Sequence, residues 1–118
     1  EKSGLELGLL YRVISDGAGS SRMFEVRGPM MVARRYEPAH MKSEIYQKDI
    51  DIIRAFVRRL KCPTPLFDRS IPFYTAALAQ GWAKQDTAAI HAVLRQRAGL
   101  RSSLPRSAGR QAAKRKTA

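Results

Sequence analysis

Cysteine and long apolar runs are almost absent from this chain, and each absence excludes a class of protein. Cys62 is the only cysteine among 118 residues, which excludes an internal disulfide and a metal site built from several cysteines. We expect Cys62 to have a structural role or none. No apolar run approaches the ~18 residues that a transmembrane helix needs, and no signal peptide is recognisable. A cytoplasmic location without a membrane partner is therefore expected.

Acidic residues are missing from one end of the chain only. The net charge is +12, yet residues 95–118 have eight basic residues and no acidic one, whereas residues 1–94 have fourteen basic and ten acidic residues. The C-terminal end is also rich in Ser, Ala and Gly. We therefore expect residues 99–118 to form a basic disordered tail behind a domain of residues 1–98. A solvated extension is favoured over a nucleic-acid-binding arm, so nucleic acid is not an expected partner.

Alternation with a period of two is absent over any useful length, so the pattern indicates an all-α bundle. Apolar spacing and breaker residues predict helices over residues 5–15, 21–33, 40–61, 65–80 and 86–97. Ser3, with Glu6 three residues later, is the predicted cap of the first helix. A serine of Ser20-Ser21 is the predicted cap of the second helix, and Asp86 or Thr87 is that of the last. Gly28-Pro29 is expected to divide the second helix into two pieces, and Pro72 is expected to kink or split the fourth.

Motifs of the common enzyme classes are missing as well. The sequence has no HExxH, no CxxC and no paired-histidine spacing, so no metal site is expected. It also lacks the Gly-x-Ser-x-Gly elbow of hydrolases and the phosphate-binding P-loop. His91 stands alone beside the apolar face of the last helix, where packing or solvation is its expected role.

The sequence does contain a Lys-Asp pair in its longest predicted helix. At ~100° per residue, an apolar stripe about 140° wide forms from Ile45, Ile52, Ile53, Phe56, Val57 and Leu60. Asp49 projects near the centre of this stripe, and Lys48 projects at its edge. A buried carboxylate without a partner is costly, so the pattern favours a wet cavity such as a substrate cleft. A buried salt bridge or a frayed helix start would explain the pair as well.

Three segments resemble one known family in order and spacing. They are VISDGAGSSRMFEVRGPMMVARRYEP, YQKDIDIIRAFVRRLKCPTPLFDRS and YTAALAQGWAKQDTAAIHAVL. They are similar to the glycine-serine break, the Lys-Asp helix with its Pro-Leu joint, and the final helix of the β-hydroxyacid dehydrogenases. This is the 3-hydroxyisobutyrate dehydrogenase-like family, and the likeness extends over about residues 3–98. The resemblance implies a helical bundle like the C-terminal domain of 6-phosphogluconate dehydrogenase.

The resemblance also implies roles for three residues. Lys48 matches the family lysine that contacts the nicotinamide cofactor, NAD or NADP. Asp49 matches the following aspartate, which lines the same cleft. Met41 stands where relatives often carry an aromatic residue that closes the substrate pocket. The family's catalytic lysine, glycine-rich substrate loop and GxGxxG motif lie upstream of the matched region, so no catalytic residue is expected in this chain.

The leading expectation is therefore the C-terminal domain of an NAD(P)-dependent hydroxyacid dehydrogenase, inactive by itself. It would help to form the substrate and cofactor cleft, with its leading interdomain helix truncated. The expected partners are an N-terminal dinucleotide-binding domain, a second copy in a homodimer, and a small hydroxy acid of the threonate or tartronate type. The first and the longest helices should then expose apolar surface. Two alternatives remain, a non-enzymatic helical interaction module with a nucleic-acid-contacting basic tail, and a remnant without activity.

Overall fold

The computed structural model describes residues 1–100, which form helices joined by turns and loops. The elements are α1 (Leu7–Ser15), α2 (Arg22–Ala33), α3 (Ser43–Arg59), α4 (Pro65–Ala79), the 3₁₀ helix η1 (Thr87–Ala89) and α5 (Ile90–Arg97). No strand occurs among residues 1–100, so the predicted all-α class is confirmed. None of the helices in this range is long and apolar enough to cross a lipid bilayer. The predicted tail lies outside the described residues except for Gly99 and Leu100.

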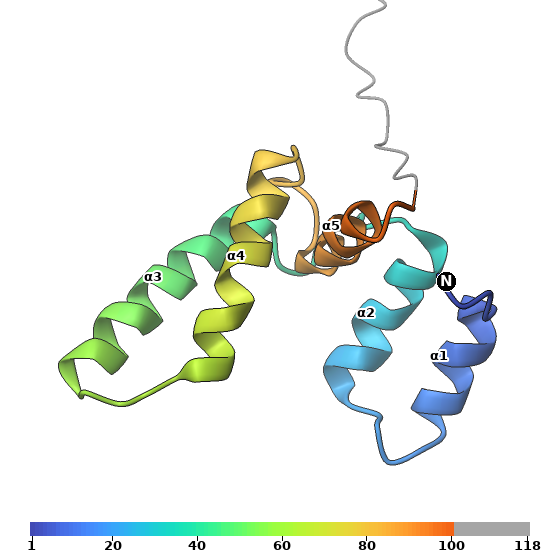
Figure 1. Ribbon diagram of the computed structural model, residues 1–118, viewed down its shortest axis with the longest axis horizontal. Coiled ribbons are helices and arrows are strands. Elements are labelled where there is room, and N and C mark those ends of the chain that lie inside the picture. The colour runs from blue at the N-terminus through green and yellow to red at the C-terminus, as the bar shows by residue number, and fades with distance from the viewer. Residues whose placement is uncertain (101–118) are drawn as a thin grey trace, which may run out of the picture.

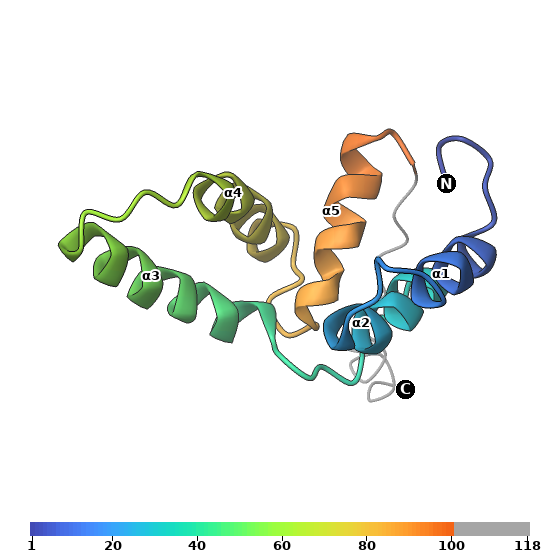
Figure 2. The same ribbon diagram turned by 90° about the horizontal axis from the view of Figure 1, so that it is seen from below.

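The helices form two hairpins with α5 between them (Figures 1 and 2). In the first hairpin α1 packs against α2, and in the second α3 packs against α4. The short helix η1 touches α2, α3 and α5, and α5 also contacts α4. The junction around η1 therefore determines how the two hairpins are placed relative to each other.

Alanine dominates the buried core, which lies where α5 and η1 meet the end of α4. The core side chains are Tyr36, Ala77, Trp82, Ala88, Ala89, Ala92 and Val93. Its two aromatic side chains, Trp82 and Tyr36, are much larger than the alanines around them. The two rings meet edge to face with centroids 5.5 Å apart. Alanines let the helix backbones approach closely, so the apolar burial of this junction depends mainly on a few large side chains.

The N-terminal caps differ from the prediction for α1 and agree with it for α2. Ser3 does not cap α1, because the helix begins at Leu7 and Glu6 is the cap. The Glu6 carboxylate accepts hydrogen bonds from the backbone N–H groups of Gly8 at 2.7 Å and Leu9 at 2.6 Å. These bonds satisfy two N–H groups at the first turn, which removes the need for an upstream cap. In α2 the hydroxyl of Ser21 accepts from the N–H of Phe24 at 3.0 Å.

Neither proline divides its helix, so the predicted two pieces of α2 and a split in α4 are wrong. α2 runs unbroken through Pro29, and α4 runs unbroken through Pro72. Each proline removes only one backbone donor, and packing against a neighbouring helix can offset that loss. In α2 the carbonyl of Glu25, four residues before Pro29, lies 3.5 Å from the donating hydroxyl of Tyr11. A side chain of α1 therefore contacts the carbonyl that the proline leaves without its helical donor.

Gly28 marks a close approach of α1 and α2. It is buried, and a Cβ at this position would lie 2.5 Å from Cε2 and 2.6 Å from Cδ2 of the Tyr11 ring. We predict that Gly28→Ala lowers the free energy of unfolding by up to about 2 kcal/mol, because overpacking outweighs the ~1 kcal/mol gain in helix propensity. Urea unfolding followed by circular dichroism measures this change. In a Tyr11→Leu background the same substitution should be neutral or stabilising, and an equal loss there would contradict the assigned clash.

Candidate functional site

The face of α3 that packs against the rest of the chain is not the one expected. Ser43 and Ile50 are its buried residues, with relative exposures of 1% and 0%. Tyr46 on the same face meets Tyr74 of α4, with ring centroids 4.7 Å apart. This mixed polar and apolar face, one side of the predicted apolar stripe, is the side that α4 covers.

The apolar stripe of α3 points away from the described core, and Asp49 at its centre is half-buried. The exposures of the stripe are 48% for Ile45, 58% for Ile52, 39% for Ile53, 51% for Phe56 and 57% for Leu60. Val57 alone in this set is half-buried. α1 is similar, because Leu9 is 50% and Val13 62% exposed. Apolar surface on the first and longest helices, which the family resemblance predicts, is thus present.

Lys48 and Asp49 lie in the second turn of α3. Lys48 is exposed and Asp49 is half-buried. Within residues 1–100 neither side chain makes a hydrogen bond or an ion pair, so the alternative of a buried salt bridge between them is not realised. A frayed helix start does not account for them either, because α3 is regular from Ser43 onward. Both side chains are therefore available to a ligand, and their cleft role stays a prediction.

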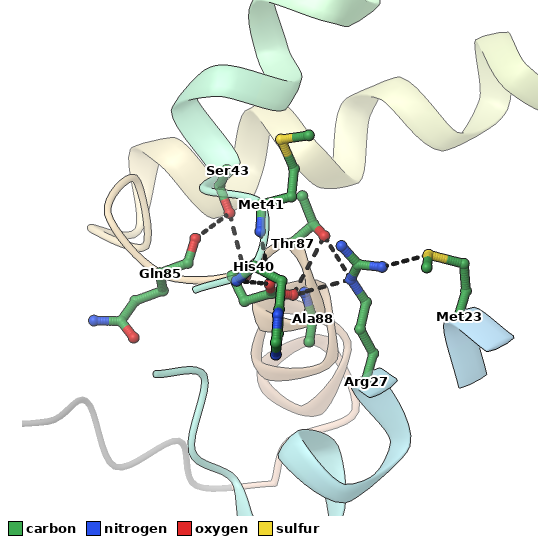
Figure 3. A network of polar contacts seen from close by, with 9 residues as sticks. Met23, Arg27, His40, Met41, Ser43, Gln85, Thr87 and Ala88 are labelled. Atoms are coloured by element: carbon green, nitrogen blue, oxygen red, sulfur yellow. Dashed lines mark hydrogen bonds and ion pairs between the residues drawn. The ribbon is translucent and has the colours of Figure 1, made fainter. Parts of the chain in front are cut away.

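Met41 lies in the segment before α3 and is held by its backbone. Its N–H donates to Oδ2 of Asp86 at 3.0 Å, and its carbonyl accepts from the N–H of Thr87 at 2.9 Å. The Met41 side chain extends away from this polar network (Figure 3). The structure thus places Met41, Lys48 and Asp49 on one continuous segment at the start of α3. No polar contact joins the three within residues 1–100.

Asp86 organises this region, and the sequence predicted only its capping role. Its side chain is fully buried and accepts five hydrogen bonds, whose donor residues are labelled in Figure 3. Oδ1 accepts from Nε of Arg27 at 3.0 Å, from the N–H of Ala88 at 2.9 Å and from the hydroxyl of Thr87 at 3.4 Å. Oδ2 accepts from the N–H groups of His40 at 2.8 Å and Met41 at 3.0 Å. One carboxylate therefore joins α2, the segment before α3, and η1.

The environment of Asp86 keeps its carboxylate ionised. Burial by itself would raise the pKa of Asp86, but the hydrogen bonds from Ala88, Met41 and His40 and the charge of Arg27 together lower that pKa below its ordinary value. An ionised carboxylate only accepts hydrogen bonds, so both oxygens of Asp86 are suited to these donors. Asp86 therefore acts as a structural acceptor near neutral pH.

The start of α3 is fixed by the segment that leads to Asp86. The N–H of Ser43 donates to the carbonyl of Gln85 at 2.9 Å, and the N–H of Glu44 donates to the carbonyl of Ala83 at 3.1 Å. The Ser43 hydroxyl also donates to the Gln85 carbonyl at 3.2 Å. These bonds satisfy the first N–H groups of α3, whose N-cap Lys42 makes no side-chain capping bond. The position of the Lys-Asp pair thus depends on the Asp86 network.

A second charged cluster lies near the N-terminus and contains His91. Oε2 of Glu1 accepts from Nε of Arg95 at 2.7 Å and lies 3.4 Å from Nε2 of His91, while Oε1 accepts from Arg34 at 2.6 Å. Nδ1 of His91 lies 3.0 Å from the hydroxyl of Tyr36. Burial lowers the pKa of His91 and raises the pKa of Tyr36 to about 12. His91 thus packs against the core, the role that the sequence favoured.

The sequence of residues 1–94 matches the protein family described as NAD-binding of NADP-dependent 3-hydroxyisobutyrate dehydrogenase. The chain belongs to this family. The predicted family is therefore confirmed, and the expected cofactor, NAD or NADP, is the one in the family's description.

Individual relatives are similar over most of this chain. The L-threonate dehydrogenases of Escherichia coli K12 and Haemophilus influenzae are each 32% identical over 89 residues, 75% of this chain and 29% of theirs. The chloroplastic glyoxylate/succinic semialdehyde reductase 2 of Arabidopsis thaliana is 27% identical and is covered over 25% of its length. The crystal structure of 3-hydroxyisobutyrate dehydrogenase from Salmonella typhimurium superposes with a TM-score of 0.72 at 28% identity, covering 78% of this chain and 32% of that one. The chain thus spans less than a third of these relatives.

Proposed function

We propose that this chain is the helical domain of an NAD(P)-dependent dehydrogenase that transfers hydride between nicotinamide and a small hydroxy acid. The family match over residues 1–94 is the observation that carries the proposal. The L-threonate dehydrogenases among the relatives suggest a hydroxylated sugar acid as substrate. By itself the chain should not catalyse, because the family resemblance implies that the GxGxxG motif and the catalytic lysine lie upstream of the matched region.

The residues at the start of α3 fit a cofactor and substrate cleft. Lys48 offers an exposed ammonium that has no protein partner within residues 1–100, so it can donate charge-assisted hydrogen bonds to a ligand. Asp49 can orient that ammonium or a substrate hydroxyl, and Met41 can supply an apolar wall. The nicotinamide itself would accept or supply the hydride, and the protein positions the groups around it.

The exposed apolar residues of α1 and α3 support the proposed partners. Surfaces with several exposed large apolar side chains commonly mark interfaces. The N-terminal dinucleotide-binding domain and a second copy of the chain in a homodimer are the partners that we propose for them. The proposed cleft at Lys48 adjoins the α3 surface, so an N-terminal domain that covers the stripe would also close the cleft.

A chimera tests the function directly. Residues 1–100 would replace the matching helical part of the L-threonate dehydrogenase of Escherichia coli K12, and NAD reduction with L-threonate would be measured. We predict that Lys48→Ala lowers kcat/KM by about 10- to 100-fold, the value of one or two charge-assisted hydrogen bonds. Arg69→Ala, which removes an exposed charge from α4, is the matched control and should have no effect.

The possible outcomes separate the domain assignment from the role of Lys48. An active chimera whose Lys48→Ala variant keeps full turnover and cofactor affinity would refute the role of Lys48 and leave the domain assignment intact. A folded chimera that binds neither NAD nor NADP would refute the proposed function itself.

A further inference from the structure

A pocket opens between the outer ends of α3 and α4, away from the Lys48 site. Its volume is about 440 Å³, and we call it the hairpin pocket. Its polar and central lining residues are Arg54, Arg58, Cys62, Thr64, Asp68 and Ile71. The two helices stand apart at this end of the hairpin, where residues 60–64 connect them (Figures 1 and 2).

The net positive charge of residues 1–94 is concentrated at this end. Residues 54–69 contain five basic residues and one acidic residue, whereas the rest of residues 1–94 contains nine of each. All of the net positive charge of residues 1–94 thus belongs to the tip of one hairpin. A concave surface of one charge sign raises the local concentration of ions of the opposite sign. The hairpin pocket is therefore a place where an anion is favoured.

Two arginines of the pocket have no carboxylate partner. Arg54 is half-buried, and neither its guanidinium nor that of Arg58 makes an ion pair or a hydrogen bond within residues 1–100. They are four residues apart on α3, so they share a face and repel each other. Arg27, by contrast, is paired with Asp86 at 3.0 Å. A dianion between Arg54 and Arg58 would remove their repulsion and accept several hydrogen bonds.

The start of α4 adds donors to the same pocket. Thr64 and Pro63 line it immediately before α4, a helix of 15 residues. Thr64 makes no side-chain capping bond to the backbone, so the first N–H groups of α4 lack a cap from this residue. Its hydroxyl instead donates to Oδ2 of Asp68 at 3.3 Å. Asp68 is the one carboxylate in the lining, and it opposes an anion.

We propose that the hairpin pocket binds a phosphate-type dianion, either free phosphate or the phosphate group of a small soluble molecule. Arg54 and Arg58 hold it from α3, and the first turn of α4 faces it from the other side. This site is separate from the proposed hydride-transfer cleft and does not depend on that function. Because Asp68 opposes the ligand, its replacement by asparagine should strengthen binding.

Cys62 makes the proposal measurable, because it is the only cysteine, is exposed and lines the pocket. The alkylation rate of Cys62 by iodoacetamide would be measured on the full chain as inorganic phosphate is added. Sodium chloride at equal ionic strength and alkylation of free glutathione are the controls. We expect phosphate to slow alkylation in a saturable way. Glycerol 3-phosphate should do so at similar or lower concentration if the natural ligand is a phosphate ester, and only inorganic phosphate should do so if it is the free ion.

Substitutions test which residues are responsible for the protection of Cys62 by phosphate. Arg54→Gln and Arg58→Gln should each weaken phosphate protection about tenfold, since each removes charge-assisted hydrogen bonds. Arg69→Gln, a charge loss outside the lining, should weaken protection far less than either substitution does, and Asp68→Asn should lower the phosphate concentration that is needed. Circular dichroism checks that each variant is folded. If an arginine variant does not fold, the stronger phosphate protection expected of Asp68→Asn tests the proposal instead.

Several results would overturn the proposal. Protection that does not saturate, that matches the effect of chloride, or that survives both arginine substitutions would do so. Protection by vesicles of anionic lipid without protection by phosphate would also overturn it, because the basic tip would then be a lipid-binding surface.

Discussion

Replacing Asp86 with alanine is expected to lower the free energy of unfolding by about 3–5 kcal/mol. The substitution leaves three backbone N–H groups, those of His40, Met41 and Ala88, without their acceptor. It also leaves Arg27, whose side chain is only 19% exposed, without its carboxylate. Trp82 is the only tryptophan and is buried, so its fluorescence during urea unfolding measures the change.

Asp86→Asn is the matched control, because it retains a carbonyl oxygen of nearly the same size. It should lose less stability than the alanine variant, since one side-chain oxygen can still accept from the backbone. Equal stability of the alanine variant and the unsubstituted chain would show that the Asp86 network does not hold the junction together.

Asp86 also makes the free energy of unfolding decrease as the pH falls. The pKa of Asp86 is lowered on folding, so its contribution is present above the ordinary aspartate pKa of about 3.9 and is lost as pH falls below it. We expect the unsubstituted chain to lose stability with acidification faster than Asp86→Asn does. The pKa values of Glu1 and Glu6 are lowered as well, so a smaller acid slope should remain in the variant.

Trp82→Ala is expected to have a loss of similar size, about 3–5 kcal/mol. Trp82 is 3% exposed and is the largest side chain of a core that otherwise consists largely of alanines, so its removal leaves a cavity that Met30 and Met31 beside it can fill only in part. Because the substitution removes the fluorescent probe, far-ultraviolet circular dichroism during urea unfolding is the suitable measurement.

Two further variants calibrate that result. Trp82→Phe keeps an aromatic ring against Tyr36 and should lose roughly half as much or less. Leu66→Ala, at a side chain that is 87% exposed, should change stability by no more than about 0.5 kcal/mol. A Trp82→Ala variant as stable as Leu66→Ala would contradict the assignment of the core to this junction.

Local chemistry explains which features the sequence could predict. The helix starts at Ser21 and at Pro65 depend on neighbouring residues only, and they lie where the pattern placed them. The start of α1 was misplaced because two residues could cap it, and only the bonds of Glu6 distinguish them. The prolines of α2 and α4 were expected to divide their helices, but in α2 the freed carbonyl is contacted by Tyr11 of another helix, which no local pattern reveals.

The Lys-Asp pair also shows what the local sequence can predict and what it cannot. The periodicity of α3 correctly predicted an apolar stripe with Asp49 in it, but periodicity cannot say which segment covers a stripe. Within residues 1–100 α4 covers the neighbouring face, and the stripe is left exposed. The anomaly of a buried carboxylate therefore disappears, and an exposed Lys48 beside a half-buried Asp49 takes its place.

The sequence by itself determined the all-α class, most helix boundaries and, through three segments in register, the family. These depend on periodicity, caps and order, which are properties of neighbouring residues along the chain. Only the tertiary structure decided which face of α3 is packed, that Arg27 reaches Asp86 across 59 residues of sequence, and that the unpaired arginines line one pocket. Such contacts join segments that are far apart in the sequence, so no local pattern predicts them.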